Sequence, residues 1–408
     1  MNAAAVPTLP ALARRFLAIG CTAWGGPVVQ IATLHTELVE RAHWATPQHF
    51  RRALAVYQAL PGPEATEMCV WFGTLVRGRP GGLCAGLCFV LPGLVVMLLT
   101  CALLQGLSPW PSWLGAAITG MQCAALALLL RAAQRLLVVG TQRRPVACGV
   151  ALLAGVGAWL GVPFAVGLVA GGLAVLASEL PRRLSLGAAG SRGHGPLLAL
   201  IGAAWLAIVV WHVTTNPTAD AATAGPHRAA DLATLAVTGL RAGLLTFGGA
   251  YTAIPFLQAD ATGPGGWMSD SAMLSGIAVG SVLPAPMIIV GTWVGWAGGG
   301  LPGALLVTLG IFLPAFLFPL LLHDRLERLT RQRGLHAFLD GIAATVAGLV
   351  LTTALQLGAQ TLGQHGLPGA AVTGIVLVAL ARWRGRPAVP LVMLGAGLAA
   401  ALLGAARA

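Results

Sequence analysis

The chain contains no lysine and only two tyrosines among its 408 residues, and charged residues of all kinds make up only 9% of it. A soluble protein carries a charged surface, so this scarcity excludes an ordinary soluble domain. Hydrophobic residues make up 57% of the sequence and occur in long runs. We therefore expect an all-α polytopic membrane protein embedded in a lipid bilayer.

Paired metal-ligand motifs and nucleotide-binding motifs are also missing. The seven cysteines lie mostly within apolar segments, with neither a CxxC pair nor a nucleotide fingerprint nearby. We therefore expect no metal, no cofactor and no enzymatic activity. The net charge of +12 arises from arginines in short segments between apolar runs, where the positive-inside rule explains them, so no nucleic-acid partner is expected.

The stretch Gln58–Glu67 interrupts an apolar, helix-forming region. Pro61 and Pro63 cannot lie inside one continuous helix, because each lacks a backbone N–H and disfavours helical geometry in the preceding residue. Non-helical backbone at membrane depth is tolerated only where it is buried in protein or lines a cavity. We expect a binding site here, with Pro63 as the first residue of the next helix and that helix's positive dipole end facing an anion.

This break recurs because the chain is duplicated. The sequence Trp24-Gly25-Gly26 returns 223 residues later as Phe247-Gly248-Gly249, and LPGP at Leu60 returns as LPAP at Leu283. Further pairs keep a spacing of 222 or 223: Trp44 with Trp267, Pro80 with Pro302, and Pro92 with Pro314. Internal repeats are typical of secondary transporters. We predict homologous halves at 12–178 and 232–406, joined by a segment at 179–231 with one extra transmembrane helix.

Several apolar segments are too short to cross about 30 Å of hydrocarbon, which needs about 20 residues. In the first half these are 12–24, 27–40, 49–60 and 63–77. We interpret them as two re-entrant hairpins with the GGP and PGP sequences at their tips. Longer spans follow at 81–105 and 113–138, and a shorter pair at 145–160 and 162–178. Reading the hairpins as full spans is an alternative that hydropathy leaves open.

The extra span, 196–213, moves the chain to the other side of the membrane. Basic segments at 325–333 and 382–386 then return to the cytoplasm under the positive-inside rule. The two halves are therefore predicted to form an inverted repeat, with four broken segments meeting near the midplane.

The motifs WGGP at Trp24, LPGPE at Leu60, FVLPG at Phe89, FGGAYTAIP at Phe247 and LPAP at Leu283 resemble those of the chromate ion transporter (CHR) family in its long, two-domain form. The similarity covers nearly the whole chain. It implies a multi-pass protein of the bacterial inner membrane that exports chromate and confers chromate resistance, with sulfate as an isosteric analogue. Three residues depart from the family pattern: Trp24 for Phe, Ala250 for Pro and Ala285 for Gly. These departures predict a second half that binds less tightly or only supports the first.

A tetrahedral dianion needs hydrogen-bond donors from several directions, which the helix N-termini at the breaks can supply. The predicted substrate-binding residues are those of the tips, Glu64 and two neutral donors beside them, and one intramembrane arginine: Gly25, Gly26, Pro27, Gln58, Pro61, Gly62, Pro63, Glu64, Thr66, Arg241, Gly248, Gly249, Pro284 and Pro286. Tip glycines also serve close helix packing, and Arg241 could instead snorkel to the outer surface. Glu64 and Glu67 are the candidate proton-coupling groups, with helix capping as the other role open to Glu64.

We expect secondary active transport, with chromate efflux favoured by an inside-negative potential. Uptake of sulfate or another oxyanion would need cotransported cations, and a passive anion channel is a further alternative. An intramembrane enzyme that acts on a lipid or reduces chromate is a third, although the sequence lacks a redox pair. A proton or counter-ion is the expected coupling partner, and a homodimer is a candidate assembly.

Overall fold

The computed structural model describes residues 7–24, 26–58, 60–107, 109–142, 144–179, 229–247, 249–263, 266–322, 333–383 and 387–405. Within these ranges every regular element is a helix, as the sequence predicts. The expected extra span at 196–213 lies outside them. The chain divides into two compact units, a larger one of residues 1–129, 227–324 and 357–408 and a smaller one of residues 130–226 and 325–356.

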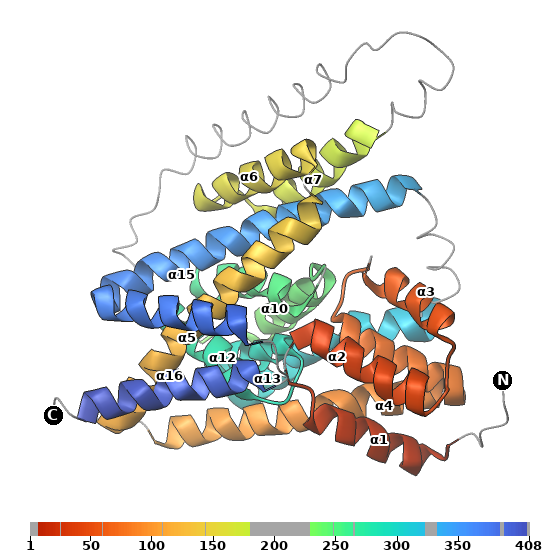
Figure 1. Ribbon diagram of the computed structural model, residues 1–408, viewed down its shortest axis with the longest axis horizontal. Coiled ribbons are helices and arrows are strands. Elements are labelled where there is room, and N and C mark those ends of the chain that lie inside the picture. Colours follow the sequence, from red (N-terminus) through yellow and green to blue (C-terminus); the bar gives the residue numbers. More distant parts are fainter. Residues whose placement is uncertain are drawn as a thin grey trace, which may run out of the picture. The chain divides into compact units, whose positions relative to one another are not determined.

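The helices of the first half are interrupted where the prolines and glycines predict (Figure 1). In order they are α1 (Leu9–Cys21), α2 (Gly26–Leu34), the π-helix η1 (His35–Arg41), α3 (Pro47–Gln58), α4 (Glu64–Gly106), α5 (Ser112–Thr141), α6 (Pro145–Trp159) and α7 (Phe164–Glu179). The predicted break at the PGP sequence is confirmed between α3 and α4. The sequence predicts Pro63 as the first helical residue, but Pro63 is the N-cap, with φ −74° and ψ 93°, and the helix begins at Glu64.

The second half repeats this order of elements. Its helices are α10 (Leu232–Leu244), the 3₁₀ turn η3 (Ala250–Ala253), α11 (Ile254–Thr262), α12 (Asp270–Val282), the 3₁₀ turn η4 (Met287–Ile289), α13 (Val290–Leu317), the π-helix η5 (Phe318–Leu322), α15 (Arg333–Arg382) and α16 (Ala388–Ala405). Even the helix caps correspond, because Thr8 caps α1 and Asp231 caps α10 at a spacing of 223. The duplication seen in the sequence is therefore a duplication of structure.

Two of the long helices fold back on themselves. In α4 the backbone leaves helical geometry at Arg77 and Gly78, and in α13 it does so at Gly299 and Gly300. Gly78 has φ 64° and ψ −161°, and Gly300 has φ 59° and ψ −148°, a region that favours glycine. The carbonyl oxygen of Gly81 lies against the α-carbon of Gly73, although eight residues of straight helix would separate them by about 12 Å. Each long element is thus a short helix followed by a long one, as the sequence predicts for 63–77 and 81–105.

Glycines also let the first helix of each half pack closely on the long one. Gly20 of α1 lies against the Phe89 carbonyl of α4, and Gly243 of α10 lies against the Ile311 carbonyl of α13. These positions correspond at spacings of 223 and 222. Small residues at helix contacts are the usual way to pack helices tightly in a bilayer, where the hydrophobic effect does not drive them together.

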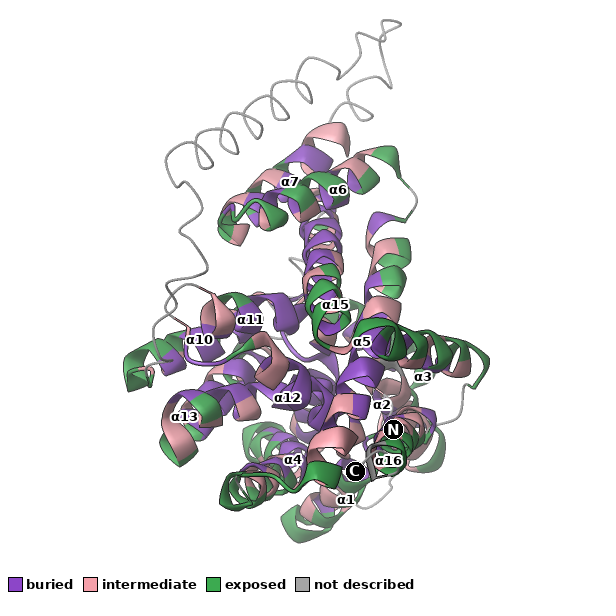
Figure 2. Cartoon of the chain, turned by 90° about the vertical axis from the view of Figure 1, so that its left-hand side faces the viewer, coloured by how far each residue is buried: buried purple, intermediate pink, exposed green. Residues whose placement is uncertain are grey.

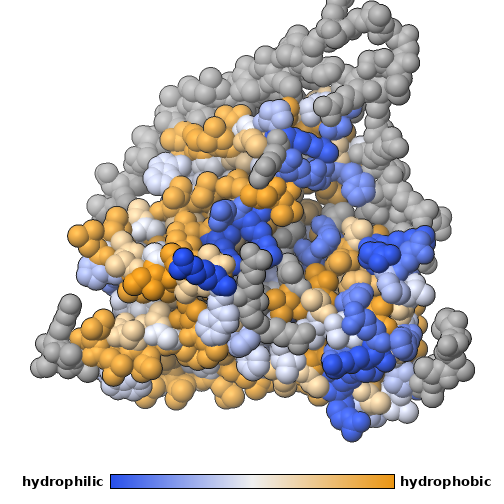
Figure 3. Space-filling model, viewed as in Figure 1, coloured by the Kyte–Doolittle hydropathy of each residue, from blue (hydrophilic) through white to orange (hydrophobic). Residues whose placement is uncertain are grey.

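The outer faces of the long helices are apolar and exposed. Along the second part of α4 the exposed leucines and valine recur every four residues: Leu83, Leu87, Leu91, Val95, Leu99 and Leu103. Along α13 and η5 the matching set is Leu301, Leu305, Leu309, Leu313, Leu317 and Leu321. The lower edge of the surface in Figure 3, where α4 lies in Figure 1, is largely hydrophobic. Such continuous apolar stripes are typical of helices in contact with lipid.

Four described helices are long and apolar enough to cross a membrane: Glu64–Gly106, Ser112–Thr141, Met287–Leu321 and Gly334–Arg382. The short helix α12 differs from them, because its residues from Met273 to Ser281 are all buried (Figure 2). An apolar helix that is buried on all sides belongs to the protein interior, so α12 is an internal element of the larger unit.

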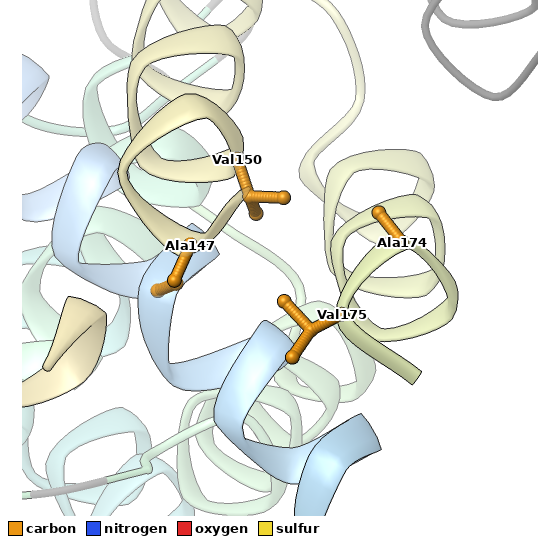
Figure 4. Close-up of a cluster of buried hydrophobic side chains, with 5 residues drawn as sticks. Ala147, Val150, Ala174 and Val175 are labelled. Atoms are coloured by element: carbon orange, nitrogen blue, oxygen red, sulfur yellow. The ribbon is translucent and has the colours of Figure 1, made fainter. Parts of the chain in front are cut away.

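In the smaller unit, α6 and α7 pack together through small side chains. Ala147 and Val150 of α6 lie against Ala174 and Val175 of α7, with Ala344 of α15 in the same cluster (Figure 4). At one end of this packing the Arg144 guanidinium contacts Glu179 at 3.2 Å and Asp340 at 3.8 Å. The unit therefore has its own core of small residues closed by an ion-pair cluster.

The fold-back of α4 and α13 predicts the effect of a single methyl group. Gly73→Ala and Gly295→Ala place that group against the carbonyl oxygens of Gly81 and Gly303, so each should lower the free energy of unfolding by about 1–3 kcal/mol. Gly149→Ala in α6 is the matched control, because open space surrounds that position and alanine is the better helix former. Thermal unfolding in detergent gives the melting temperatures of the three variants. Equal melting temperatures for Gly73→Ala and Gly149→Ala would contradict the fold-back.

Candidate functional site

The four helix breaks of the larger unit lie in contact with one another. They lie between α1 and α2 and between α3 and α4 in the first half, and between α10 and η3 and between α12 and η4 in the second. The Gly62 N–H donates a hydrogen bond to the Thr246 carbonyl over 2.8 Å, and the indole N–H of Trp24 donates to the Val282 carbonyl over 3.0 Å. Each half thus contributes two breaks to one shared centre.

Gln30 also joins the two halves, and the sequence did not mark it as a site residue. Its side-chain N–H group donates to the Ala23 carbonyl at 2.8 Å and to the Ala285 carbonyl at 3.2 Å, and the residue is 3% exposed. It therefore bridges a break of one half to a break of the other. At the repeat spacing of 223, Ala23 corresponds to Thr246 and Ala285 corresponds to Gly62. In this second pair the Gly62 N–H bonds directly to the Thr246 carbonyl, without a bridging side chain. A polar side chain on a predicted half-helix, four residues after Gly26, was the available signal.

The glycines at the breaks adopt conformations that other residues avoid. Gly26 has φ 78°, Gly62 φ 151° and Gly249 φ 122°. Among the described residues, a β-carbon at Gly26 would meet only the Tyr251 hydroxyl within 4 Å, and one at Gly249 would meet Pro27. The backbone is therefore openly accessible at Gly26, as close approach to a ligand requires. The predicted site residues Gly25 and Gly248 lie outside the described residues.

The prolines of both PxP sequences lie at these breaks, as predicted. Pro61 and Gly62 connect α3 to α4, and Pro284 lies between α12 and η4. Pro286 is the N-cap of η4, the same position that Pro63 holds in the first half. Gly93 in the second part of α4 lies directly against Ala285, so the long helix of the first half supports the break of the second.

The start of α4 buries three polar side chains. Glu64 is 6% exposed, and Thr66 and Glu67 are fully buried. The Glu64 carboxyl is hydrogen-bonded by the side chain of Gln58, which is exposed at the end of α3. The Thr66 hydroxyl and both Glu67 carboxyl oxygens have no hydrogen-bond partner among the described residues. Buried polar groups are almost always hydrogen-bonded, so this group of atoms is exceptional.

Arg241 belongs to an ion pair beside the second-half breaks. Its guanidinium contacts Asp260 of α11 at 2.9 Å, and the Thr238 hydroxyl donates to the other Asp260 oxygen at 3.1 Å. Asp260 therefore already compensates the charge that was predicted to bind substrate. The sequence did not reveal this pairing, because Arg241 and Asp260 lie 19 residues apart on different helices.

The two halves differ in their polar residues. At a spacing of 223, Glu64 and Glu67 correspond to Met287 and Val290, and Gln30 corresponds to Ala253. Both hydrophobic replacements at the start of the second-half helix are buried. The acidic side chains next to a break are thus a feature of the first half.

The sequence profile of the chromate transporter family matches residues 10–176 and 233–403, one match in each half. The chain belongs to the chromate transporter family. The chromate transport protein of Pseudomonas aeruginosa is 41% identical over 401 residues, which are 96% of this chain and 91% of that protein. The chromate transport protein of Cupriavidus metallidurans is 26% identical, covering 96% and 92% of the two chains. A probable chromate transport protein of Synechococcus elongatus is 26% identical, covering 91% and 89%.

Membership of the chromate transporter family agrees with the multi-pass, all-helical architecture and with its duplication. The relatives are named as transport proteins, not as enzymes. No solved structure matches the chain. The first profile match ends within α7 and the second begins within α10, so residues 177–232 are outside both matches.

The bridge made by Gln30 can be tested directly. Gln30→Leu keeps the size of the side chain but leaves the Ala23 and Ala285 carbonyls without their donor, which should lower the free energy of unfolding by about 1–3 kcal/mol. Gln48→Leu, at an exposed position of α3, is the control. Thermal unfolding of the two purified variants gives the comparison. Equal melting temperatures for the two variants would show that the Gln30 bridge does not stabilise the contact between the breaks.

Proposed function

We propose that this protein is a secondary active transporter that exports chromate, a tetrahedral dianion, from the cytoplasm, with sulfate as a competing analogue. The observation that carries the proposal is the meeting of four helix breaks, two from each half, in one place. The names of its relatives supply the substrate, and the geometry supplies a reason why an anion would bind there.

The binding site is proposed at the breaks because non-helical backbone inside a membrane protein is used to coordinate ions. Helix N-termini at Gly26 and Glu64 present backbone N–H groups and the positive ends of helix dipoles. Chromate and sulfate carry four oxygens in a tetrahedron, so donors must approach from several directions. Breaks from both halves, including those at Gly249 and Pro284, can provide them if the halves are oppositely oriented.

Arg241 is proposed to assist by positioning the end of α10 rather than as an uncompensated charge. Its ion pair with Asp260 fixes the end of α10, which leads directly to Thr246 and so to the bond with Gly62. Gln58 and Thr66 are the proposed neutral donors beside the tip.

Export is the proposed direction because an inside-negative potential expels a dianion with about 2.3 kcal/mol per charge per 100 mV. Flux of radiolabelled chromate and sulfate in proteoliposomes, with pH and voltage set independently, tests the class of transport. A coupled transporter shows trans-stimulation by unlabelled anion inside the vesicle. Simple downhill flux under clamped voltage, without trans-stimulation, would indicate a channel instead.

Substitution of Gly62 is the most direct test of the proposed binding site at the break. Gly62→Ala forces a left-handed φ on alanine and places its methyl group 2.6 Å from a Glu67 carboxyl oxygen. Strain of about 1–3 kcal/mol at the tip should weaken transport at low chromate concentration by roughly 5- to 150-fold. Gly374→Ala in α15 is the control, since that position is surrounded by open space. Wild-type flux from Gly62→Ala would exclude the tip from the transport site.

A further inference from the structure

Glu67 is a buried acidic side chain near the start of α4. It is 0% exposed, and neither carboxyl oxygen has a hydrogen-bond partner among the described residues. One of these oxygens would lie 2.6 Å from a side chain on Gly62, so the carboxyl group packs directly against the tip of the break. The carboxyl therefore lies next to the backbone that the proposed function assigns to the anion.

A negative charge on Glu67 would have no local compensation. In the part of the chain that the structure describes, none of the recorded ion pairs includes it, and the charged group that acts on it is Glu64, which has the same sign. The surrounding break and the end of α10 contribute Gly62 and the Thr246 backbone, which do not titrate. Burial disfavours the charged form of Glu67, and a dianion at the Gly62 tip would disfavour it further, so anion binding strengthens the binding of a proton to this carboxyl.

We propose that Glu67 is the proton-binding site that couples to the anion: it binds one proton when the dianion occupies the Gly62 tip and releases it when the anion leaves. This inference rests on the proposed function. The step adds a proton from the aqueous phase to a Glu67 carboxylate oxygen, and the O–H bond breaks again on release. A neutral Glu67 leaves no negative charge beside the dianion, whereas an ionised Glu67 repels it, so proton and anion favour each other's binding.

The geometry selects Glu67 over Glu64, which the sequence leaves equivalent. The Glu64 carboxyl already accepts a hydrogen bond from Gln58, whose side chain is exposed, so its charge is partly stabilised. Glu67 lies one helical turn deeper, and it is this carboxyl that contacts Gly62. Its repeat-related residue, Val290, cannot bind a proton, so this coupling site exists once per chain.

Calorimetric titration of the purified full-length protein with sulfate tests the assignment. Sulfate remains a dianion throughout the neutral range, so only the protein's protons contribute. Repeating the titration in buffers of different ionisation enthalpy gives the number of protons taken up per anion. We expect uptake of up to about one proton by the wild type, and an anion affinity that falls on the order of tenfold or more as the pH rises.

Glu67→Gln is the decisive variant, because it mimics the neutral acid at the same size. It should bind sulfate without proton uptake and with an affinity that no longer depends on pH. Glu37→Gln, at a surface carboxylate paired with Arg41, is the matched control and should keep wild-type proton uptake. Glu67→Ala is a second neutral variant, for use if Glu67→Gln does not fold. It should likewise bind sulfate without proton uptake.

The remaining outcomes separate this inference from the proposed function. Wild-type proton uptake by folded Glu67→Gln, loss of uptake in Glu64→Gln alone, or loss of sulfate binding in both neutral Glu67 variants would overturn the assignment. Sulfate binding by the wild type without any proton uptake would overturn the coupling but leave the transport proposal intact. No sulfate or chromate binding by the wild type at all would overturn both.

Discussion

The central constraint on this fold is that interrupted helices inside a membrane must find new partners for their backbone polar groups. Lipid offers none, and each unsatisfied group costs several kcal/mol. The breaks of one half therefore bond to those of the other: the Gly62 N–H to the Thr246 carbonyl, and the Ala23 and Ala285 carbonyls to the Gln30 amide. The same constraint that makes breaks expensive thus brings all four together and creates a polar centre within an apolar protein.

Glycine packing holds that centre in place. The fold-backs at Gly78 and Gly300 bring a short helix against a long one, and the contacts of Gly20 and Gly243 fix the first helix of each half to the same long helix. The first break of each half therefore follows a helix that packs closely on the long one, and the second break leads toward the short helix that folds back on it. A site whose supports are helices rather than loops keeps its geometry when a ligand enters or leaves.

The sequence predicted most of this architecture because prolines and glycines act locally. The breaks at Pro61 and Pro284, the short helices around them and the constant repeat spacing all follow from backbone chemistry that acts within a few residues. What the sequence could not predict depends on distant partners. The pairing of Arg241 with Asp260, the bridge from Gln30 to Ala285 and the contact of Glu67 with Gly62 are all set by how helices pack. Even the single correction, Pro63 as N-cap, concerns one residue at a helix end, where boundaries are least certain.

The duplication explains why the backbone is nearly symmetric while the chemistry is not. Caps, breaks and fold-backs correspond at a spacing of 222 or 223, because each copy needs them in order to fold. Gln30, Glu64 and Glu67 have no polar counterpart, since Ala253, Met287 and Val290 stand in their places. A second buried carboxylate facing the first across the shared centre would repel both its twin and an anion. Carboxylates on one side only avoid that arrangement, so the asymmetry at Glu64 and Glu67 suits the proton coupling proposed for Glu67.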